Sequence, residues 1–210
     1  MPSGAMRTLI AIPAYNEAKS LPGVLAELHE SQPSADILVI DDCSKDATSE
    51  AAHASGAYVV RHPINQGYSV AVQTGAKFAR QGGYEVLLWM DGDGQHRPAD
   101  AAALIEDVRC GRCDVCIGSR FLSSDSYRMP LARRAGSKVF SVLVLILTGK
   151  KVRDVTSGFQ AMSRKVIELC ASDRFPADYP DANLILQYLL SGFIVQEKGV
   201  AMKANETGKS

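Results

Sequence analysis

The sequence predicts a three-layer α/β domain in which helices cover both faces of a mostly parallel sheet. Short apolar runs that suit buried strands alternate along the chain with longer segments of helical periodicity. The segments that connect them are short, as is usual in this class of fold. The 210 residues are 46% hydrophobic and 22% charged, which suffices for one domain with a substantial core.

The amino-terminal half predicts four strands separated by helices. The first strand should stop at Pro13, since proline rarely continues a strand. Ser44 or Asp46 is suited to cap the helix after the second strand, and Gly82-Gly83 to end the helix before the fourth. The expected strands are 8–12, 37–40, 57–60 and 86–90, and the two longer helices are 17–31 and 68–80.

The carboxyl-terminal half continues the alternation and contains one unusually apolar helix, expected at 130–147. Its start is basic, whereas the run Val139–Leu147 is almost entirely apolar. A membrane-spanning helix needs ~20 apolar residues, so we expect Val142–Leu147 to be either part of the core or interfacial. The other expected elements are helices at 100–108, 166–171 and 183–190, and strands at 114–118, within 154–162 and at 194–200.

Three of the predicted strands end in polar loops, namely Tyr15–Glu17, Asp41–Asp42 and Asp91–Gln95. The carboxyl ends of parallel strands share one edge of the sheet, where open α/β folds bind their ligands. Asp91 and Asp93 are two residues apart and would point the same way in an extended segment. With Gln95 they offer oxygen ligands that suit Mg²⁺ or Mn²⁺. The alternative is a Gly-Asp turn with solvated carboxylates.

Composition and motifs argue against several classes of protein. Lys plus Arg and Asp plus Glu balance at 23 each, so nucleic acid is not an expected partner. No G-x-G-x-x-G follows the first strand, which argues against a dinucleotide oxidoreductase. Five cysteines in a chain without a signal peptide favour reduced thiols in a cytosolic setting. The C-x-x-C steps within Cys110–Cys116 are interpreted as structural, because a zinc site usually requires a second pair of ligands.

Six short motifs occur in order along the chain. They are Pro13-x-Tyr15-Asn16-Glu17, Asp41-Asp42-x-Ser44-x-Asp46, Asn65-x-Gly67, Asp91-x-Asp93-x-Gln95-His96, Gly118-Ser119-Arg120 and Thr156-Ser157-Gly158-Phe159. Together they resemble the inverting family 2 glycosyltransferases of the GT-A fold, and in particular the dolichol- and polyprenyl-phosphate sugar synthases. The resemblance implies a single Rossmann-like GT-A domain over residues 1–210. Its nucleotide-binding half would span about 7–118 and its acceptor half about 119–210.

The resemblance assigns the donor site to residues at the predicted sheet edge. Pro13, Tyr15 and Glu17 would line the pocket for the nucleotide base and ribose. Asp42 would accept a hydrogen bond from the base, and Asp91 would lie at the diphosphate.

The resemblance also implies a metal site. Asp91 and Asp93 would form the DxD-type pair, with Asp93 and Gln95 as direct ligands of Mg²⁺ or Mn²⁺ and Asp91 beside them. A divalent cation stabilises the negative charge that grows on a departing nucleoside diphosphate. Asp93 is therefore a predicted catalytic residue.

Arg120, Arg133 and Ser137 match positions that hold the acceptor phosphate in the polyprenyl-phosphate branch. Arg133 and Ser137 are four residues apart on a predicted helix and share a face, and a guanidinium beside a hydroxyl suits a phosphate. Arg133 could instead only solvate the start of the helix. Asp181 matches the acidic base of relatives that act on a hydroxyl, or is an N-cap. Arg120 and Asp181 join Asp93 as predicted catalytic residues.

The predicted function is metal-dependent, inverting transfer of a sugar from a UDP- or GDP-linked donor to polyprenyl phosphate. The expected location is cytoplasmic and peripheral, at the inner face of the membrane. The first alternative is a sugar hydroxyl acceptor with Asp181 as base. The second is a catalytically silent nucleotide-sugar-binding module, because Asn205 stands where the family usually has an arginine at the diphosphate. Gln66 likewise stands where a basic residue is frequent. The sugar and the oligomeric state are left open.

Overall fold

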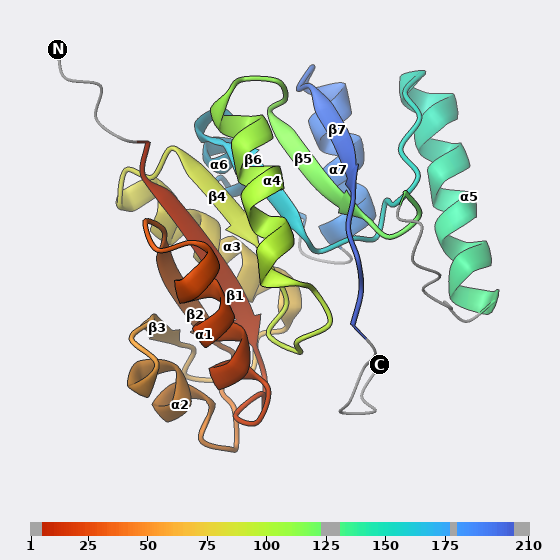
Figure 1. The fold of residues 1–210 in the computed structure, drawn as a ribbon. Helices are drawn as coiled ribbons and strands as arrows, with labels where there is room; N and C mark the ends of the chain where they lie inside the picture. The colour runs from red at the N-terminus through yellow and green to blue at the C-terminus, as the bar shows by residue number, and fades with distance from the viewer. Residues whose placement is uncertain (1–5, 123–130, 177–179, 204–210) are drawn as a thin grey trace, which may run out of the picture.

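Seven strands form one sheet in the order β3-β2-β1-β4-β6-β5-β7. All neighbouring pairs are parallel except the two that β6 makes with β4 and β5. Helices cover both faces of the sheet (Figure 1), which confirms the predicted three-layer α/β architecture. The computed structural model describes residues 6–122, 131–176 and 180–203, and only the backbone of 131–138 and 180–182.

The order of the elements follows the sequence prediction. The strands are β1 (Thr8–Ala14), β2 (Asp36–Asp41), β3 (Tyr58–Arg61), β4 (Val86–Trp89), β5 (Val115–Ser119), β6 (Gln160–Ser163) and β7 (Val195–Gly199). The helices are α1 (Leu21–Ser31), α2 (Thr48–Ala54), α3 (Tyr68–Gln81), α4 (Pro98–Arg109), α5 (Leu131–Thr148), α6 (Arg164–Cys170) and α7 (Pro180–Leu190).

The prediction that Pro13 ends the first strand is wrong, because β1 continues to Ala14. The carbonyl of Ala11 accepts a hydrogen bond from Met90 N. Backbone groups alternate sides along a strand, so those of Ala11 and Pro13 both face β4. The β1–β4 ladder stops at Ala11, so the missing N–H of Pro13 removes no ladder hydrogen bond.

α1 begins at Leu21 rather than at Glu17 because the preceding residues bond to another loop. Asn16 has a φ of 57°, in the left-handed region. Its N–H donates to Ser44 Oγ, and the N–H of Glu17 donates to Thr48 Oγ1, both at 2.9 Å. These bonds hold the β1–α1 loop against the β2–α2 loop, so the two loops form one surface at the sheet edge.

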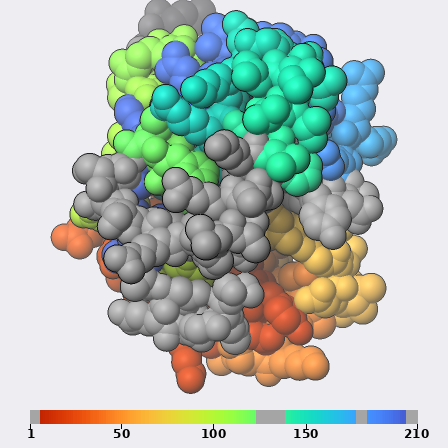
Figure 2. Space-filling view, turned by 90° about the vertical axis from the view of Figure 1, so that its right-hand side faces the viewer, coloured from red at the N-terminus to blue at the C-terminus, as the bar shows by residue number. Residues whose placement is uncertain are grey.

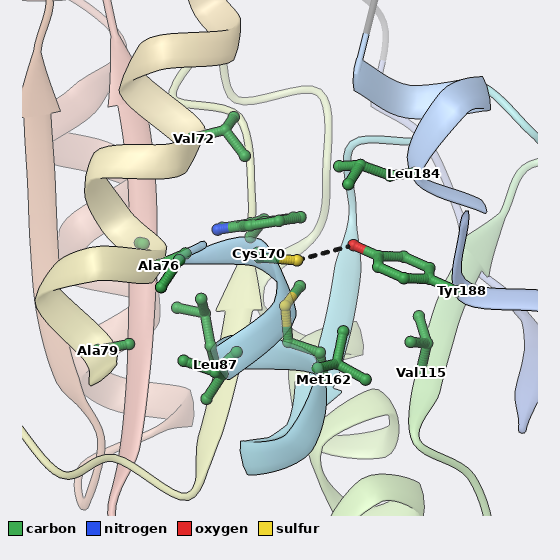
Figure 3. Close-up of a cluster of buried hydrophobic side chains, with 14 of the residues drawn as sticks. Val72, Ala76, Ala79, Leu87, Val115, Met162, Cys170, Leu184 and Tyr188 are labelled. Atoms are coloured by element: carbon green, nitrogen blue, oxygen red, sulfur yellow. Dashed lines mark hydrogen bonds between the residues drawn. The ribbon is translucent and has the colours of Figure 1, made fainter. Parts of the chain in front are cut away.

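The hydrophobic core consists of two layers, one on each face of the sheet. α1, α2 and α4 contribute to one layer, and α3, α6 and α7 to the other. In the second layer, side chains from α3, β4, α6 and α7 meet, and Cys170 Sγ lies 3.3 Å from the Tyr188 hydroxyl (Figure 3). Burial raises the pKa of Cys170 to about 12, so this thiol behaves as a core side chain.

α5 lies beside α7 at the end of the sheet that carries β5 and β7 (Figure 1). Of the segment Val142–Leu147 only Val144 is buried, and Ile146 is 72% exposed. The alternative in which this segment belongs to the core is therefore wrong. Figure 2 shows α5 on the outer surface. Within the described residues, no helix combines the length and the apolar character that crossing a membrane requires.

Candidate active site

A cavity of about 270 Å³ opens at the carboxyl ends of β1 and β2, beside the start of α3. It contains three of the predicted donor residues, Pro13, Tyr15 and Asp42. Glu17 is not among the residues that line it, and the carboxylate of Glu17 instead accepts a hydrogen bond from Ser20 Oγ at 2.6 Å. The complete lining is Pro13, Ala14, Tyr15, Asp42, Asn65, Gly67, Tyr68 and Ala71.

Asp42 organises the loop that closes one side of this cavity. Its Oδ1 accepts from His62 Nδ1 at 2.7 Å and from Gln66 N at 2.9 Å, and its Oδ2 accepts from Gly67 N at 2.7 Å. His62 is held in turn by Thr74 Oγ1, 3.0 Å from Nε2. A carboxylate oxygen can accept two hydrogen bonds, so Oδ2 of Asp42 retains capacity to accept one more.

Asp41 fixes the adjacent loop from inside the protein. It is fully buried, and its carboxylate accepts from Ser44 N at 2.8 Å and from Ser49 Oγ, with Arg61 at 3.3 Å. Burial alone would raise the pKa of Asp41, but the hydrogen bonds from Ser44 and Ser49 and the charge of Arg61 outweigh it and lower the pKa. The charged carboxylate therefore stabilises the loop that presents Asp42.

The Asp91–Gln95 motif is a turn rather than an extended segment. Gly94 has a φ of 77°, and residues 92–94 form the turn. The premise that Asp91 and Asp93 project alike from an extended chain is therefore wrong. Asp91 Oδ1 lies 3.5 Å from the Tyr68 hydroxyl and Oδ2 lies 3.6 Å from His96 Nε2, whereas Asp93 contacts Gln95.

The side chains of Asp93 and Gln95 lie side by side, as two ligands of one cation would. Gln95 N donates to Asp93 Oδ1 at 2.9 Å, and the side-chain amide of Gln95 contacts Oδ2. Rotating this amide by half a turn would place its oxygen beside the carboxylate. In the described part of the chain, no group of three or more His, Cys, Asp and Glu is arranged for a metal. The oxygen donors of Asp93 and Gln95, next to the half-exposed Asp91, suit Mg²⁺ or Mn²⁺, which share their shell with phosphates and water.

The motif at Thr156–Phe159 packs directly against Tyr68, Asp91 and His96. A Cβ on Gly158 would lie 2.7 Å from the Tyr68 hydroxyl and 3.4 Å from both carboxylate oxygens of Asp91. The rings of Phe159 and His96 are in tilted contact, with 4.8 Å between their centroids. These contacts explain why the motif has glycine at 158.

A second cavity, of about 500 Å³, lies on the other side of the Asp91–Gln95 motif, between α1 and the carboxyl-terminal segment. Asp93, Lys19 and Lys203 are among its lining residues. Lys203 N donates to the carbonyl of Gln95 at 2.8 Å, and Lys203 Nζ binds the carboxylate of Glu27. The carboxyl-terminal segment thus holds the Asp91–Gln95 motif in place, which the sequence did not indicate.

The predicted acceptor residues are only partly described. Arg120 directly follows β5, and its guanidinium binds the carboxylate of Asp154, with Nη2 to Oδ1 at 2.7 Å. Arg133 and Ser137 both lie on α5, as expected, but their side chains are outside the described residues. Asp181 is one residue inside α7 rather than before it, and its side chain is likewise outside the description.

The sequence did not identify Tyr68 as a candidate site residue. It showed Asn65 and Gly67 as a motif but gave them no place in the predicted site. Tyr68 lines the cavity and also approaches Asp91. A signal for it was present, because Tyr68 directly follows the Asn65-x-Gly67 motif. Asn205, whose identity raised the alternative of a silent binding module, lies outside the described residues.

The fold and this arrangement of motifs agree with one family of known proteins. A sequence model described as Glycosyl transferase family 2 matches residues 9–170. The chain belongs to this family. The predicted membership of family 2 is thereby confirmed.

Relatives of this family 2 glycosyltransferase include enzymes whose names contain polyprenol or undecaprenyl phosphate. A polyprenol monophosphomannose synthase of Mycolicibacterium smegmatis is 32% identical over 97% of this chain and 80% of its own length. An undecaprenyl-phosphate mannosyltransferase of Micrococcus luteus is 35% identical over 74% of this chain and 66% of its own length. These similarities confirm the predicted resemblance to the polyprenyl-phosphate branch.

Solved structures show the GT-A fold. Glucosyl-3-phosphoglycerate synthase of Mycobacterium tuberculosis, in complex with Mn²⁺, UDP and glucosyl-3-phosphoglycerate, has a TM-score of 0.75 at 18% identity over 98% of this chain and 74% of its own. A mannosyltransferase of Pyrobaculum calidifontis, in complex with GDP-Man and Mn²⁺, has a TM-score of 0.69 at 18% identity over 99% of this chain and 59% of its own. The predicted GT-A fold is confirmed, whereas the division near residue 118 and the roles of single residues stay predictions.

Proposed function

We propose that this family 2 glycosyltransferase transfers a sugar from a UDP- or GDP-linked donor to polyprenyl phosphate, with inversion, at the cytoplasmic face of a membrane. One observation carries the proposal. The cavity, the Asp91–Gln95 motif and Arg120 lie at the same edge of the sheet, and the exposed apolar helix α5 lies at the end of the sheet that carries β5 and β7. The cavity proposed for the donor and a surface compatible with lipid therefore lie on one domain.

The cavity would hold the nucleotide of the donor. Pro13 and Tyr15 supply apolar and aromatic surface for a base, and Asp42 Oδ2 can accept a hydrogen bond from it. Tyr68 lies between this cavity and Asp91, so the diphosphate would extend toward Asp91 and Asp93. The Mn²⁺ and nucleotide complexes of structural neighbours support this placement of the donor.

Asp93 and Gln95 would hold a divalent cation, which supplies electrostatic stabilisation to the departing diphosphate. Asp91 would complete the oxygen donors of this site. Arg120 would orient the phosphate of the acceptor so that one of its oxygens attacks the anomeric carbon while the bond to the diphosphate breaks. The acceptor phosphate is already anionic, so no residue needs to remove a proton, and a single displacement inverts the anomeric centre.

α5 would hold the protein at the membrane where the acceptor resides. Its exposed apolar residues are followed by three exposed cations, Lys150, Lys151 and Arg153. An apolar helix face flanked by cations binds an anionic bilayer through buried apolar area and electrostatic attraction. The lipid phosphate acceptors in the names of the two relatives support this surface as the membrane contact.

The first test measures thermal stability with UDP, GDP, CDP and their sugars, each with and without Mn²⁺. A ligand present at about 100 times its dissociation constant stabilises the folded state by about 2.7 kcal/mol. We expect a Mn²⁺-dependent rise in melting temperature for one nucleotide, which identifies the base. Absence of a shift with every nucleotide would contradict the donor site.

The second test measures transfer of labelled sugar from the identified donor to polyprenyl phosphate in detergent. We expect transfer to the lipid phosphate, and unchanged turnover in Asp181→Asn, because a phosphate acceptor needs no general base. Transfer to a polysaccharide hydroxyl instead, lost in Asp181→Asn, would contradict the proposal. Donor binding without transfer or hydrolysis would indicate a silent binding module.

A further inference from the structure

Arg120 is bound by a carboxylate that no motif of the sequence had identified. Asp154 is fully buried, and it accepts hydrogen bonds from Arg120 N and Nε at 2.9 Å and from Nη2 at 2.7 Å. Nη2 also donates to Thr156 Oγ1 at 2.9 Å. The side chain of Arg120 is 11% exposed, so these bonds fix both the backbone and the guanidinium at the end of β5.

Asp154 is itself held from the neighbouring strand. Glu197 of β7 accepts hydrogen bonds from Asp154 N at 2.8 Å and from Arg153 N at 2.9 Å, one on each carboxylate oxygen. β7 pairs in parallel with β5, and Glu197 is opposite Ile117. A continuous path therefore runs from Glu197 through the backbone at 153–154 and the carboxylate of Asp154 to the guanidinium of Arg120.

The same segment connects Arg120 to the donor site. Thr156, which bonds Arg120, is two residues before Gly158, and Gly158 packs against Asp91 and Tyr68. Ser157 Oγ donates to the carbonyl of Gly118 at 2.7 Å, which holds the segment alongside the end of β5. A shift of Arg120 relative to the diphosphate would therefore require this segment to move.

We propose that Asp154 and Glu197 are positioning residues that hold the Arg120 guanidinium at the place where the acceptor phosphate binds. The inference rests on the proposed function, because it requires Arg120 to bind that phosphate. Replacing a buried ion pair with apolar side chains is often neutral for stability, so a contribution to folding stability alone does not explain the pair of Arg120 and Asp154. A long side chain that is ordered in advance loses less entropy when it binds a ligand.

The test is a double-mutant cycle of Asp154→Asn and Arg120→Gln, with transfer to polyprenyl phosphate as the readout. In the wild-type background, Asp154→Asn should raise the KM for the lipid phosphate about tenfold and leave the donor KM unchanged. In the Arg120→Gln background, Asp154→Asn should change the acceptor KM less than about twofold, because Asp154 acts through Arg120.

Two further variants separate positioning from folding. Glu197→Gln keeps one acceptor oxygen for the two N–H groups, so we expect a smaller rise in acceptor KM, about threefold. Glu168→Gln removes a carboxylate from the exposed pair with Arg164 and should leave both KM values unchanged. The Mn²⁺-dependent rise in melting temperature with nucleotide should persist in Asp154→Asn and show that this variant is folded.

The outcomes distinguish this inference from the proposed function. Wild-type transfer to the lipid phosphate with an unchanged acceptor KM in Asp154→Asn would overturn the positioning role alone. An equal rise of donor and acceptor KM, or a tenfold effect that persists in the Arg120→Gln background, would also overturn it. Wild-type protein that binds donor but transfers nothing to polyprenyl phosphate would overturn the proposed function, and the positioning role with it.

Discussion

The hydroxyl oxygen of Tyr68 lies 3.5 Å from Oδ1 of Asp91 and joins the cavity at the ends of β1 and β2 to the Asp91–Gln95 motif. Tyr68 is the first residue of α3, and Asp91 follows β4, so the contact joins the start of α3 to the carboxyl end of the next strand. Gly158 packs against both side chains. The site therefore depends on a close approach of three loops and not on any one motif.

Replacing Asp93 with alanine should abolish the metal-dependent binding of the donor. The change removes a carboxylate next to Gln95, so we expect no Mn²⁺-dependent rise in melting temperature and transfer reduced about a hundredfold or more. Thermal shift and transfer assays measure the two effects. Asp173→Ala, at an exposed aspartate, should behave as wild type. A full nucleotide shift retained in Asp93→Ala would contradict the assigned ligand.

Replacing Gly158 with alanine should weaken donor binding without unfolding the protein. The new Cβ would lie 2.7 Å from the Tyr68 hydroxyl, so the tyrosine or Asp91 must move. Overpacking of this kind costs about 1–3 kcal/mol, and we expect about tenfold weaker nucleotide binding in calorimetry.

Gly23→Ala provides the control for this change. Gly23 lies in α1, and nothing lies within 4 Å of a Cβ built there, so alanine should leave affinity unchanged and raise helix stability by about 0.5–1 kcal/mol. If Gly158→Ala bound nucleotide as tightly as Gly23→Ala, the contact with Tyr68 would have no part in the donor site.

The sequence predicted the elements well because local patterns specify them. The apolar run at Val86–Trp89 and the periodicity of Tyr68–Gln81 are visible without tertiary information. The start of α1 was mispredicted because the N–H groups of Asn16 and Glu17 bond to a loop about 30 residues away. Such pairings are invisible to a window of local sequence.

The structure brings several of the predicted site residues together, but not in the geometry that the sequence suggested. The sequence motifs identified Asp42, Asp91 and Asp93. The turn at 92–94, which the motifs did not reveal, directs Asp91 toward Tyr68 and Asp93 toward Gln95. The pair formed by Arg120 and Asp154 spans 34 residues and has no local signature. The exposure of α5 was undecided for a physical reason, since an apolar helix suits a core and a bilayer equally.

Protonation of Asp41 should make the protein less stable in acid. Its pKa in the folded state lies below the ordinary value of 3.8, so the carboxylate contributes stability that is present above that pH and is lost as the pH falls through the lower, folded-state pKa. Asp107 acts in the same direction, because hydrogen bonding to Lys198 lowers its pKa. Urea denaturation at pH 7 and at pH 3 measures the effect.

Asp41→Asn tests this assignment. At pH 7 the variant should lose about 1–3 kcal/mol of unfolding free energy, because Arg61 and the serine donors lose a charged acceptor. Between pH 4 and pH 3 it should lose less additional stability than wild type. An acid dependence equal to that of wild type would mean that Asp41 does not titrate with unfolding.

The exposed face of α5 should bind the protein to anionic membranes. Ile146 and Leu147 are 72% and 60% exposed. Burying such side chains in a bilayer contributes about 1.5–3 kcal/mol each, so Ile146→Ser with Leu147→Ser should reduce binding to anionic lipid vesicles at least tenfold in sedimentation. Ile64→Ser, at an isoleucine that is 66% exposed elsewhere on the surface, should leave vesicle binding unchanged.

The cations after α5 should make a separate, salt-dependent contribution to the affinity for anionic vesicles. Lys150 and Lys151 are exposed at the end of the helix, and each cation near an anionic surface contributes about 1 kcal/mol. Lys150→Gln with Lys151→Gln should therefore weaken vesicle binding at low salt and have little effect at high salt, where charges are screened. If neutral vesicles bound wild type as tightly as anionic ones, the apolar face alone would account for docking. If neither kind of vesicle bound, the assignment of α5 as the membrane contact would be wrong.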